Sequence, residues 1–188
     1  MPLSLSWDLF IAVFVALVVA YSFIIGKHES VKVIVAAYIA IVAVHGIESL
    51  TLRTLPLLQA TLGTLQISFT PLTIALGKLS LFIIAIILLT LRGGLAVSYV
   101  GEPGIVMNTA MTLVLGIAKA GLLLSTLICY VAGVPLFQDT QVPAAAWIAP
   151  LLSQSIILRI MLEQRDAWFA LPAFVLLLVD ILSKEEKS

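Results

Sequence analysis

The chain has 188 residues, of which 62% are hydrophobic and 11% are charged, and its formal net charge is zero. No polar stretch is long enough to form a separate soluble domain, so we expect a single integral membrane domain over residues 1–188. Lysine and arginine are scattered singly, and the clustered basic surface that binds a phosphate backbone is missing. We therefore expect no nucleic-acid partner.

The N-terminal part of the chain predicts a helical hairpin. Residues 9–26 carry no charge and, at about 1.5 Å per residue, nearly span a hydrocarbon core of about 30 Å. Because no basic region precedes this run, we expect a permanent anchor rather than a cleaved signal. Gly26 is expected to cap this helix, and after the link KHESVK a second apolar segment covers residues 33–50. The two segments predict antiparallel helices joined by a tight turn.

The middle of the chain predicts one surface helix and two further spans. In residues 56–66, leucines recur at helical spacing among polar residues. This pattern predicts an amphipathic helix that lies on the membrane surface and begins near Pro56. Residues 69–91 then form an apolar helix that stops at Arg92, and residues 105–133 form the next one.

The C-terminal part is punctuated by prolines and gives a weaker pattern. Residues 151–165 have one polar and one apolar stripe, which predicts an interfacial or re-entrant helix. Residues 167–182 are apolar but contain Pro172, and they either cross the membrane or lie against the other helices. The predicted fold class is all-α: a polytopic membrane helical bundle with four or five transmembrane helices and one or two interfacial amphipathic helices.

Basic residues in short links predict the orientation. Lys27 and Lys32 place the first link in the cytoplasm, because lysine and arginine near span ends favour the inner side. The N-terminus is then outside, and a fifth crossing returns Lys184 and Lys187 to the cytoplasm. We expect this arrangement in a bacterial inner membrane.

Four ionisable residues predict a polar layer within the bundle. Lys119 is the only charge between Gly104 and Gln138, and a lysine near the bilayer midplane costs about 2.5–3.5 kcal/mol. Counting about 1.5 Å per residue from the cytoplasmic ends places His45, Glu48 and Lys119 at similar depths, roughly 18–22 Å. Lys78 comes out at a similar level.

These residues predict a buried site with Glu48 as the counter-ion of one lysine and His45 as a titratable neighbour, as in ion or proton pathways. Lys119 is the expected partner of Glu48, because Glu48 is the only carboxylate predicted at its level. The alternative is structural: the lysines snorkel to an interface, Glu48 ends its helix at the headgroups, and His45 is a packing residue. Both interpretations are open at this stage.

No metal, cofactor or catalytic site is expected. Two histidines, one cysteine and no clustered carboxylates give no ligand spacing that a metal would use. The motifs of serine hydrolases, zinc proteases and P-loop proteins are missing. We therefore expect a non-enzymatic protein.

Small residues predict close helix packing. Ala36, Ala40 and Ala43 form a stripe on one helix, and Gly116 and Ala120 form a small-xxx-small pair on another. Helices with such stripes can approach closely. The stripes serve packing within the chain or, as the alternative, a dimer face.

The start of the chain resembles a known family. W-D-L-F at residues 7–10, a single long span, Gly26–Lys27 and a second span that begins VKVIVAAYIA are similar to the colicin V production protein (CvpA) family. That family consists of small bacterial inner-membrane proteins with about four spans. The resemblance implies an accessory role in secretion or envelope maintenance, and it carries over no catalytic residues.

The expected function is a CvpA-like accessory or scaffold. The alternative is a small transporter or channel subunit that uses the layer of His45, Glu48, Lys78 and Lys119, and a membrane-embedded enzyme ranks third. The expected partners are the lipid bilayer and either a second copy of the chain or another membrane protein.

Overall fold

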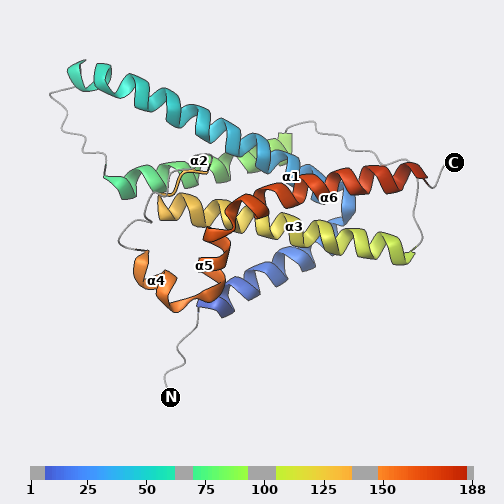
Figure 1. The fold of residues 1–188 in the computed structure, drawn as a ribbon. Coiled ribbons are helices and arrows are strands. Elements are labelled where there is room, and N and C mark those ends of the chain that lie inside the picture. The colour runs from blue at the N-terminus through green and yellow to red at the C-terminus, as the bar shows by residue number, and fades with distance from the viewer. Residues whose placement is uncertain (1–6, 62–69, 93–104, 137–147, 186–188) are drawn as a thin grey trace.

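The computed structural model describes residues 7–61, 70–92, 105–136 and 148–185. Within these ranges the regular elements are all helices (Figure 1): α1 Trp7–Thr61, α2 Pro71–Arg92, α3 Ile105–Ala132, α4 Ala149–Gln154, α5 Ile156–Glu163 and α6 Arg165–Glu185. Three of them are long and apolar enough to cross a membrane, over Trp7–Thr51, Leu72–Arg92 and Val106–Ala132. The described part of the chain is therefore all-helical, and its long apolar helices are those of a membrane protein.

Helix α1 has two arms, residues 7–25 and 27–61, that meet at Gly26. This glycine has φ 80° and ψ 178°, a backbone conformation that is essentially restricted to glycine. No atom lies within 4 Å of the place a Cβ would take, so the backbone angle rather than lack of space requires the glycine. The predicted break at Gly26 is confirmed, but the predicted link after it is helical.

The first arm of α1 runs antiparallel to α3. Near its start, Ile11 packs in one cluster with Ile128, close to the end of α3. Near its end, a Cβ at Gly116 would lie 3.1 Å from the Oγ of Ser22, so this glycine lets the two helices approach closely. Increasing residue numbers along the arm thus meet decreasing numbers along α3.

The second arm runs in the opposite direction, parallel to α3. Its first turn contacts α3 at Lys119, whose Nζ lies 3.5 Å from the Oγ of Ser30. Further along, His45 lines the same pocket as Tyr130, near the end of α3. The chain therefore reverses at Gly26 (Figure 1), where the predicted tight turn is a kink within α1.

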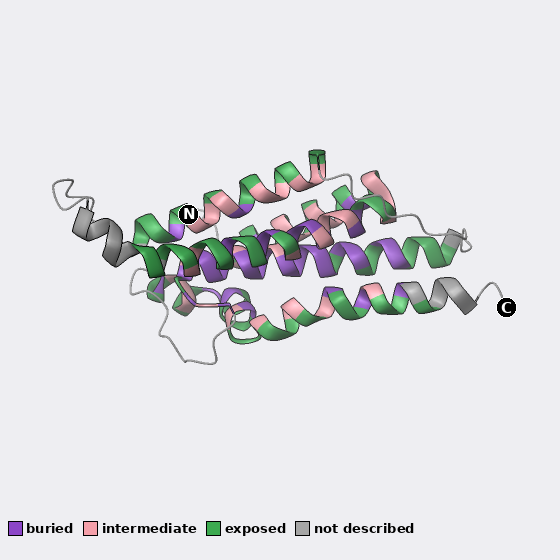
Figure 2. Ribbon diagram, turned by 90° about the horizontal axis from the view of Figure 1, so that it is seen from above, coloured by how far each residue is buried: buried purple, intermediate pink, exposed green. Residues whose placement is uncertain are grey.

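Helix α3 is the centre of the bundle, and most of its residues are buried (Figure 2). Helix α6 packs on it where the ring of Trp168 covers Gly121, and from there it runs antiparallel to α3 (Figure 1). The hydroxyl of Tyr38 in the second arm of α1 donates a hydrogen bond to the carbonyl of Phe169. Helix α6 is thereby tied to both α3 and α1.

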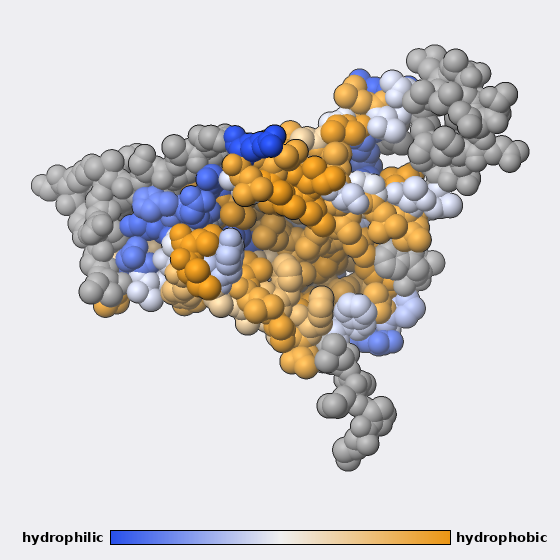
Figure 3. Space-filling view, turned by 180° about the vertical axis from the view of Figure 1, so that it is seen from behind, coloured by the Kyte–Doolittle hydropathy of each residue, from blue (hydrophilic) through white to orange (hydrophobic). Residues whose placement is uncertain are grey.

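The outer surface is largely apolar. The face drawn in Figure 3 has a broad hydrophobic area across the middle, and the polar areas lie mostly towards the sides. Many large aliphatic side chains of the candidate spans are exposed, which is the surface that lipid requires. Examples from α1, α2 and α3 are Ile24, Val42, Ile84, Leu91, Val106 and Val114.

The number of candidate spans is three, whereas four or five crossings were predicted. Helix α1 continues through the predicted link, and α6, the predicted fifth crossing, is not among the candidates. A separate surface helix beginning at Pro56 is also wrong, since α1 runs through Pro56 to Thr61. The remainder of that predicted helix, residues 62–66, lies outside the described residues.

The predicted amphipathic helix over residues 151–165 is divided into shorter pieces. Helix α4 ends before Ser155, which has an extended backbone with φ −127° and ψ 115°. The Ser155 hydroxyl accepts a hydrogen bond from the amide of Leu158 and caps α5. A serine cap in the middle of the predicted helix therefore ends one helix and begins the next.

The small residues of the two predicted stripes are buried except at one position. Ala36 and Ala40 are buried, as are Gly116 and Ala120 on α3. Ala43 is exposed, because the buried face of the second arm is centred on neighbouring positions and Ala43 falls at its edge.

Candidate functional site

A polar pocket of about 290 Å³ lies between the second arm of α1, the first turns of α2 and the end of α3. Its lining combines ionisable and hydroxyl side chains with three apolar residues that follow α3. The lining residues are His45, Glu48, Ser49, Lys78, Tyr130, Val134, Pro135 and Leu136. Three of the four residues of the predicted polar layer therefore meet in one place.

An ion pair between Glu48 and Lys78 crosses this pocket from α1 to α2. The two side chains are 30% and 21% exposed, so water or headgroups screen the pair in part. Because each charge is still largely enclosed, loss of one partner leaves the other without its counter-ion. The pair joins the two helices, and the formal charges of Glu48 and Lys78 cancel each other.

Tyr130 places a hydroxyl beside this ion pair. Its ring packs edge-on against Phe82 of α2, with the ring centroids 5.5 Å apart. The residue is only 5% exposed, and its hydroxyl has no hydrogen-bond partner among the described residues. A buried hydroxyl without a partner costs about 1–3 kcal/mol, so this group is a candidate for contact with a bound molecule.

The end of α3 supplies the apolar wall of the pocket. Gly133 has φ 67°, and its amide donates to the Tyr130 carbonyl at 3.2 Å, while the Val134 amide donates to the Cys129 carbonyl at 3.0 Å. This pair of bonds is the glycine-dependent helix stop known as a Schellman motif. It turns the chain so that Val134 and Leu136 lie against the pocket.

Lys119, the fourth predicted member, lies elsewhere. It is 1% exposed, its Nζ lies 3.5 Å from the Ser30 Oγ and 5.3 Å from the centre of the Tyr21 ring, and no carboxylate among the described residues pairs with it. The predicted pair of Glu48 with Lys119 is wrong, since Glu48 pairs with Lys78.

The error has a geometric cause. Counting about 1.5 Å per residue from the cytoplasmic ends places Glu48 level with Lys119 only if the second arm of α1 and helix α3 begin at the same level. In the structure, Ser30 at the start of the arm meets Lys119, which lies about 21 Å along α3 from Ile105 at 1.5 Å per residue. Lys119 is therefore level with the Gly26 turn, whereas Glu48 is level with the other end of α3.

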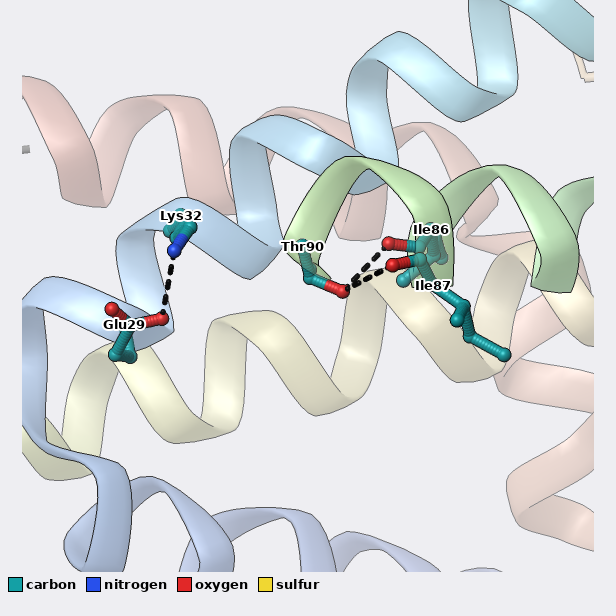
Figure 4. Close-up of polar contacts among 5 residues, drawn as sticks. All are labelled: Glu29, Lys32, Ile86, Ile87 and Thr90. Atoms are coloured by element: carbon teal, nitrogen blue, oxygen red, sulfur yellow. Dashed lines mark hydrogen bonds and ion pairs between the residues drawn. The ribbon is translucent and has the colours of Figure 1, made fainter. Parts of the chain in front are cut away.

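A second ion pair on α1 lies outside the pocket. Glu29 and Lys32 are 3.4 Å apart on one turn of the second arm (Figure 4). In the same view, the hydroxyl of Thr90 in α2 donates hydrogen bonds to the carbonyls of Ile86 and Ile87, at 2.8 and 3.1 Å. These groups are satisfied within their own helices, so they have less capacity for a ligand.

The start of α1 is anchored to α5 by a contact that the sequence analysis missed. The Ser155 hydroxyl donates to Asp8 at 2.5 Å, and the Ile157 amide donates to the same carboxylate oxygen at 3.3 Å. A carboxylate is favourable at this helix N-terminus because it accepts from unpaired amides. The contact explains why an aspartate precedes the first apolar run.

Sequence reasoning also missed Tyr130 and the Trp168–Gly121 contact. Tyr130 gave a signal, because it is a hydroxyl-bearing residue three positions before Gly133 in an apolar run. Trp168 gave none, since nothing in the sequence indicates which glycine an indole ring covers.

Comparison with protein-family models, curated proteins and solved structures finds no match to this chain. The pocket and the bundle around it are therefore the observations on which a function is argued.

Proposed function

We propose that this protein binds a small polar solute or ion in the pocket of His45, Glu48, Lys78 and Tyr130, as a subunit of a transporter or channel. One observation carries the proposal: the pocket gathers an ion pair and a buried hydroxyl without a partner among the described residues. Ionisable groups between the helices of a membrane protein are typical of substrate and ion pathways.

Measured flux tests this proposal. The double variant Glu48→Gln with Lys78→Met removes both charges together, so neither is left without its partner. In proteoliposomes loaded with small ions and polar solutes, we expect wild-type protein to raise the entry rate of at least one solute, and the double variant to lose most of that increase.

The second ion pair supplies a matched control. Glu29→Gln with Lys32→Met removes the same two charges from α1 outside the pocket, and it should keep the wild-type rates. Rates that are the same in the wild type, the pocket variant and protein-free vesicles for every solute would contradict the proposal.

A second candidate function is a CvpA-like accessory or scaffold in secretion or envelope maintenance. Two observations support it: the Glu48–Lys78 pair is already neutral within the protein, and apolar side chains cover much of the outer surface. Under this alternative, the pocket variant changes stability or partner binding and leaves flux unchanged. A second copy of the chain or another membrane protein would be the partner.

We also propose an orientation in a bacterial inner membrane, with the N-terminus outside and the C-terminus in the cytoplasm. The reversal at Gly26 and the lysines beside it, Lys27 and Lys32, support two crossings by α1, and α2, α3 and α6 bring the number to four or five. In a variant with Cys129→Ser, Leu3→Cys should label in intact cells and Glu29→Cys only after permeabilisation. Labelling in the reverse order contradicts this orientation.

A further inference from the structure

We infer that the pocket takes a zwitterion: a small molecule or headgroup that carries one anionic and one cationic group a few bonds apart. This inference rests on the proposed function, because it names the ligand class of the same site. It follows from the charges of the pocket and from the groups that they leave available.

The two fixed charges of the pocket, on Glu48 and Lys78, are of opposite sign. Glu48 and Lys78 contact each other, so their formal charges cancel within the pocket. An anion or a cation that enters alone adds a net charge to a partly enclosed site with one apolar wall, where an unpaired charge is costly. A zwitterion adds no net charge, and each of its ends meets a fixed charge of the opposite sign.

The pocket offers hydrogen-bond donors for an anionic group and an acceptor for a cationic group. The anionic group of the ligand can accept from the ammonium of Lys78 and from the Tyr130 hydroxyl, which has no partner among the described residues. The cationic group can donate to the Glu48 carboxylate. The ligand then inserts into the existing ion pair, and four alternating charges replace two.

The volume of the pocket limits the size of the ligand. The pocket volume of about 290 Å³ is just below the usual range of small-molecule sites, roughly 300–1,000 Å³, so the ligand must be small. Val134 and Leu136 give one wall an apolar surface against which a short alkyl group can pack. A small α-amino acid meets these conditions, and so does the phosphoethanolamine headgroup of a lipid.

The test compares three matched probes. L-alanine carries both charges, propionate lacks the ammonium and ethylamine lacks the carboxylate. Thermal shift and titration calorimetry on the detergent-purified protein should show binding of L-alanine, at least about tenfold tighter than binding of propionate or ethylamine, which corresponds to about 1.4 kcal/mol.

The lipid source is tested in nanodiscs. If the headgroup is the ligand, the thermal midpoint in phosphatidylethanolamine nanodiscs exceeds that in phosphatidylglycerol nanodiscs, and free L-alanine does not bind. With either ligand, the binding of L-alanine or the rise in thermal midpoint is lost in the variant Glu48→Gln with Lys78→Met. The same response remains in the variant Glu29→Gln with Lys32→Met. A free amino acid and a lipid headgroup as ligand therefore give different results in these experiments.

Two results overturn the inference. One is binding of propionate or ethylamine as tight as that of L-alanine, and the other is no response to either L-alanine or phosphatidylethanolamine. If the pocket variant still loses flux in proteoliposomes, only the zwitterion is wrong and the proposed function stands. If flux is also unaffected, both fail.

Discussion

Replacing Gly121 by alanine should destabilise the bundle although alanine is the better helix former. The added Cβ would lie 2.3 Å from Cε3 and 2.6 Å from Cζ3 of Trp168, and an indole ring held between helices cannot move aside cheaply. Overpacking costs about 1–3 kcal/mol, and the helix propensity of alanine offsets up to about 1 kcal/mol. We expect a lower thermal midpoint in mild detergent.

Gly77→Ala is the matched control. Gly77 lies within α2, and no atom is within 4 Å of the place its Cβ would take. This variant should keep or raise the thermal midpoint, because only the propensity gain remains. An equal response of Gly121→Ala and Gly77→Ala would show that α6 does not rest on α3 at this glycine.

Replacing Lys119 by methionine should stabilise the protein. Methionine has a side chain of similar length and removes the ammonium of a residue that is 1% exposed. Among the described residues, the contacts of this ammonium are the Ser30 hydroxyl and the Tyr21 ring. Burying a single ion costs several kcal/mol even after the surroundings relax, and an apolar side chain removes that cost. The measurement is the free energy of unfolding in detergent and denaturant, followed by circular dichroism.

Lys78→Met is the contrasting variant, because it leaves Glu48 without its partner. It should lower the free energy of unfolding, whereas Lys119→Met raises it. If Lys119→Met destabilises the protein instead, the contacts with Ser30 and Tyr21 outweigh the cost of burying the ammonium.

The sequence was sufficient for the features that depend on one segment at a time. Apolar length predicted apolar helices in the three regions that hold the candidate spans, although it counted four or five crossings. Gly26 predicted the break in α1, because its backbone angles there are essentially restricted to glycine. The membrane class and the helical fold follow from the same signals.

Features that depend on how one helix is offset from another could not be predicted. Residue spacing gives the position of Lys119 along α3, but contact with Ser30 decides which level of α1 it faces. The Glu48–Lys78 pair was therefore missed in favour of Glu48 and Lys119. Ser155 is similar, since its capping bond to Leu158 overrides an amphipathic pattern that continues through it.

The most direct test of the central claim is a high-resolution density map of the purified protein in lipid nanodiscs. The claim is that the pocket between α1, α2 and α3 is a ligand site. We expect density larger than a water molecule within hydrogen-bond distance of the Tyr130 hydroxyl and beside Glu48 and Lys78. A map in which the hydroxyl bonds to another protein group and side chains fill the pocket would contradict it.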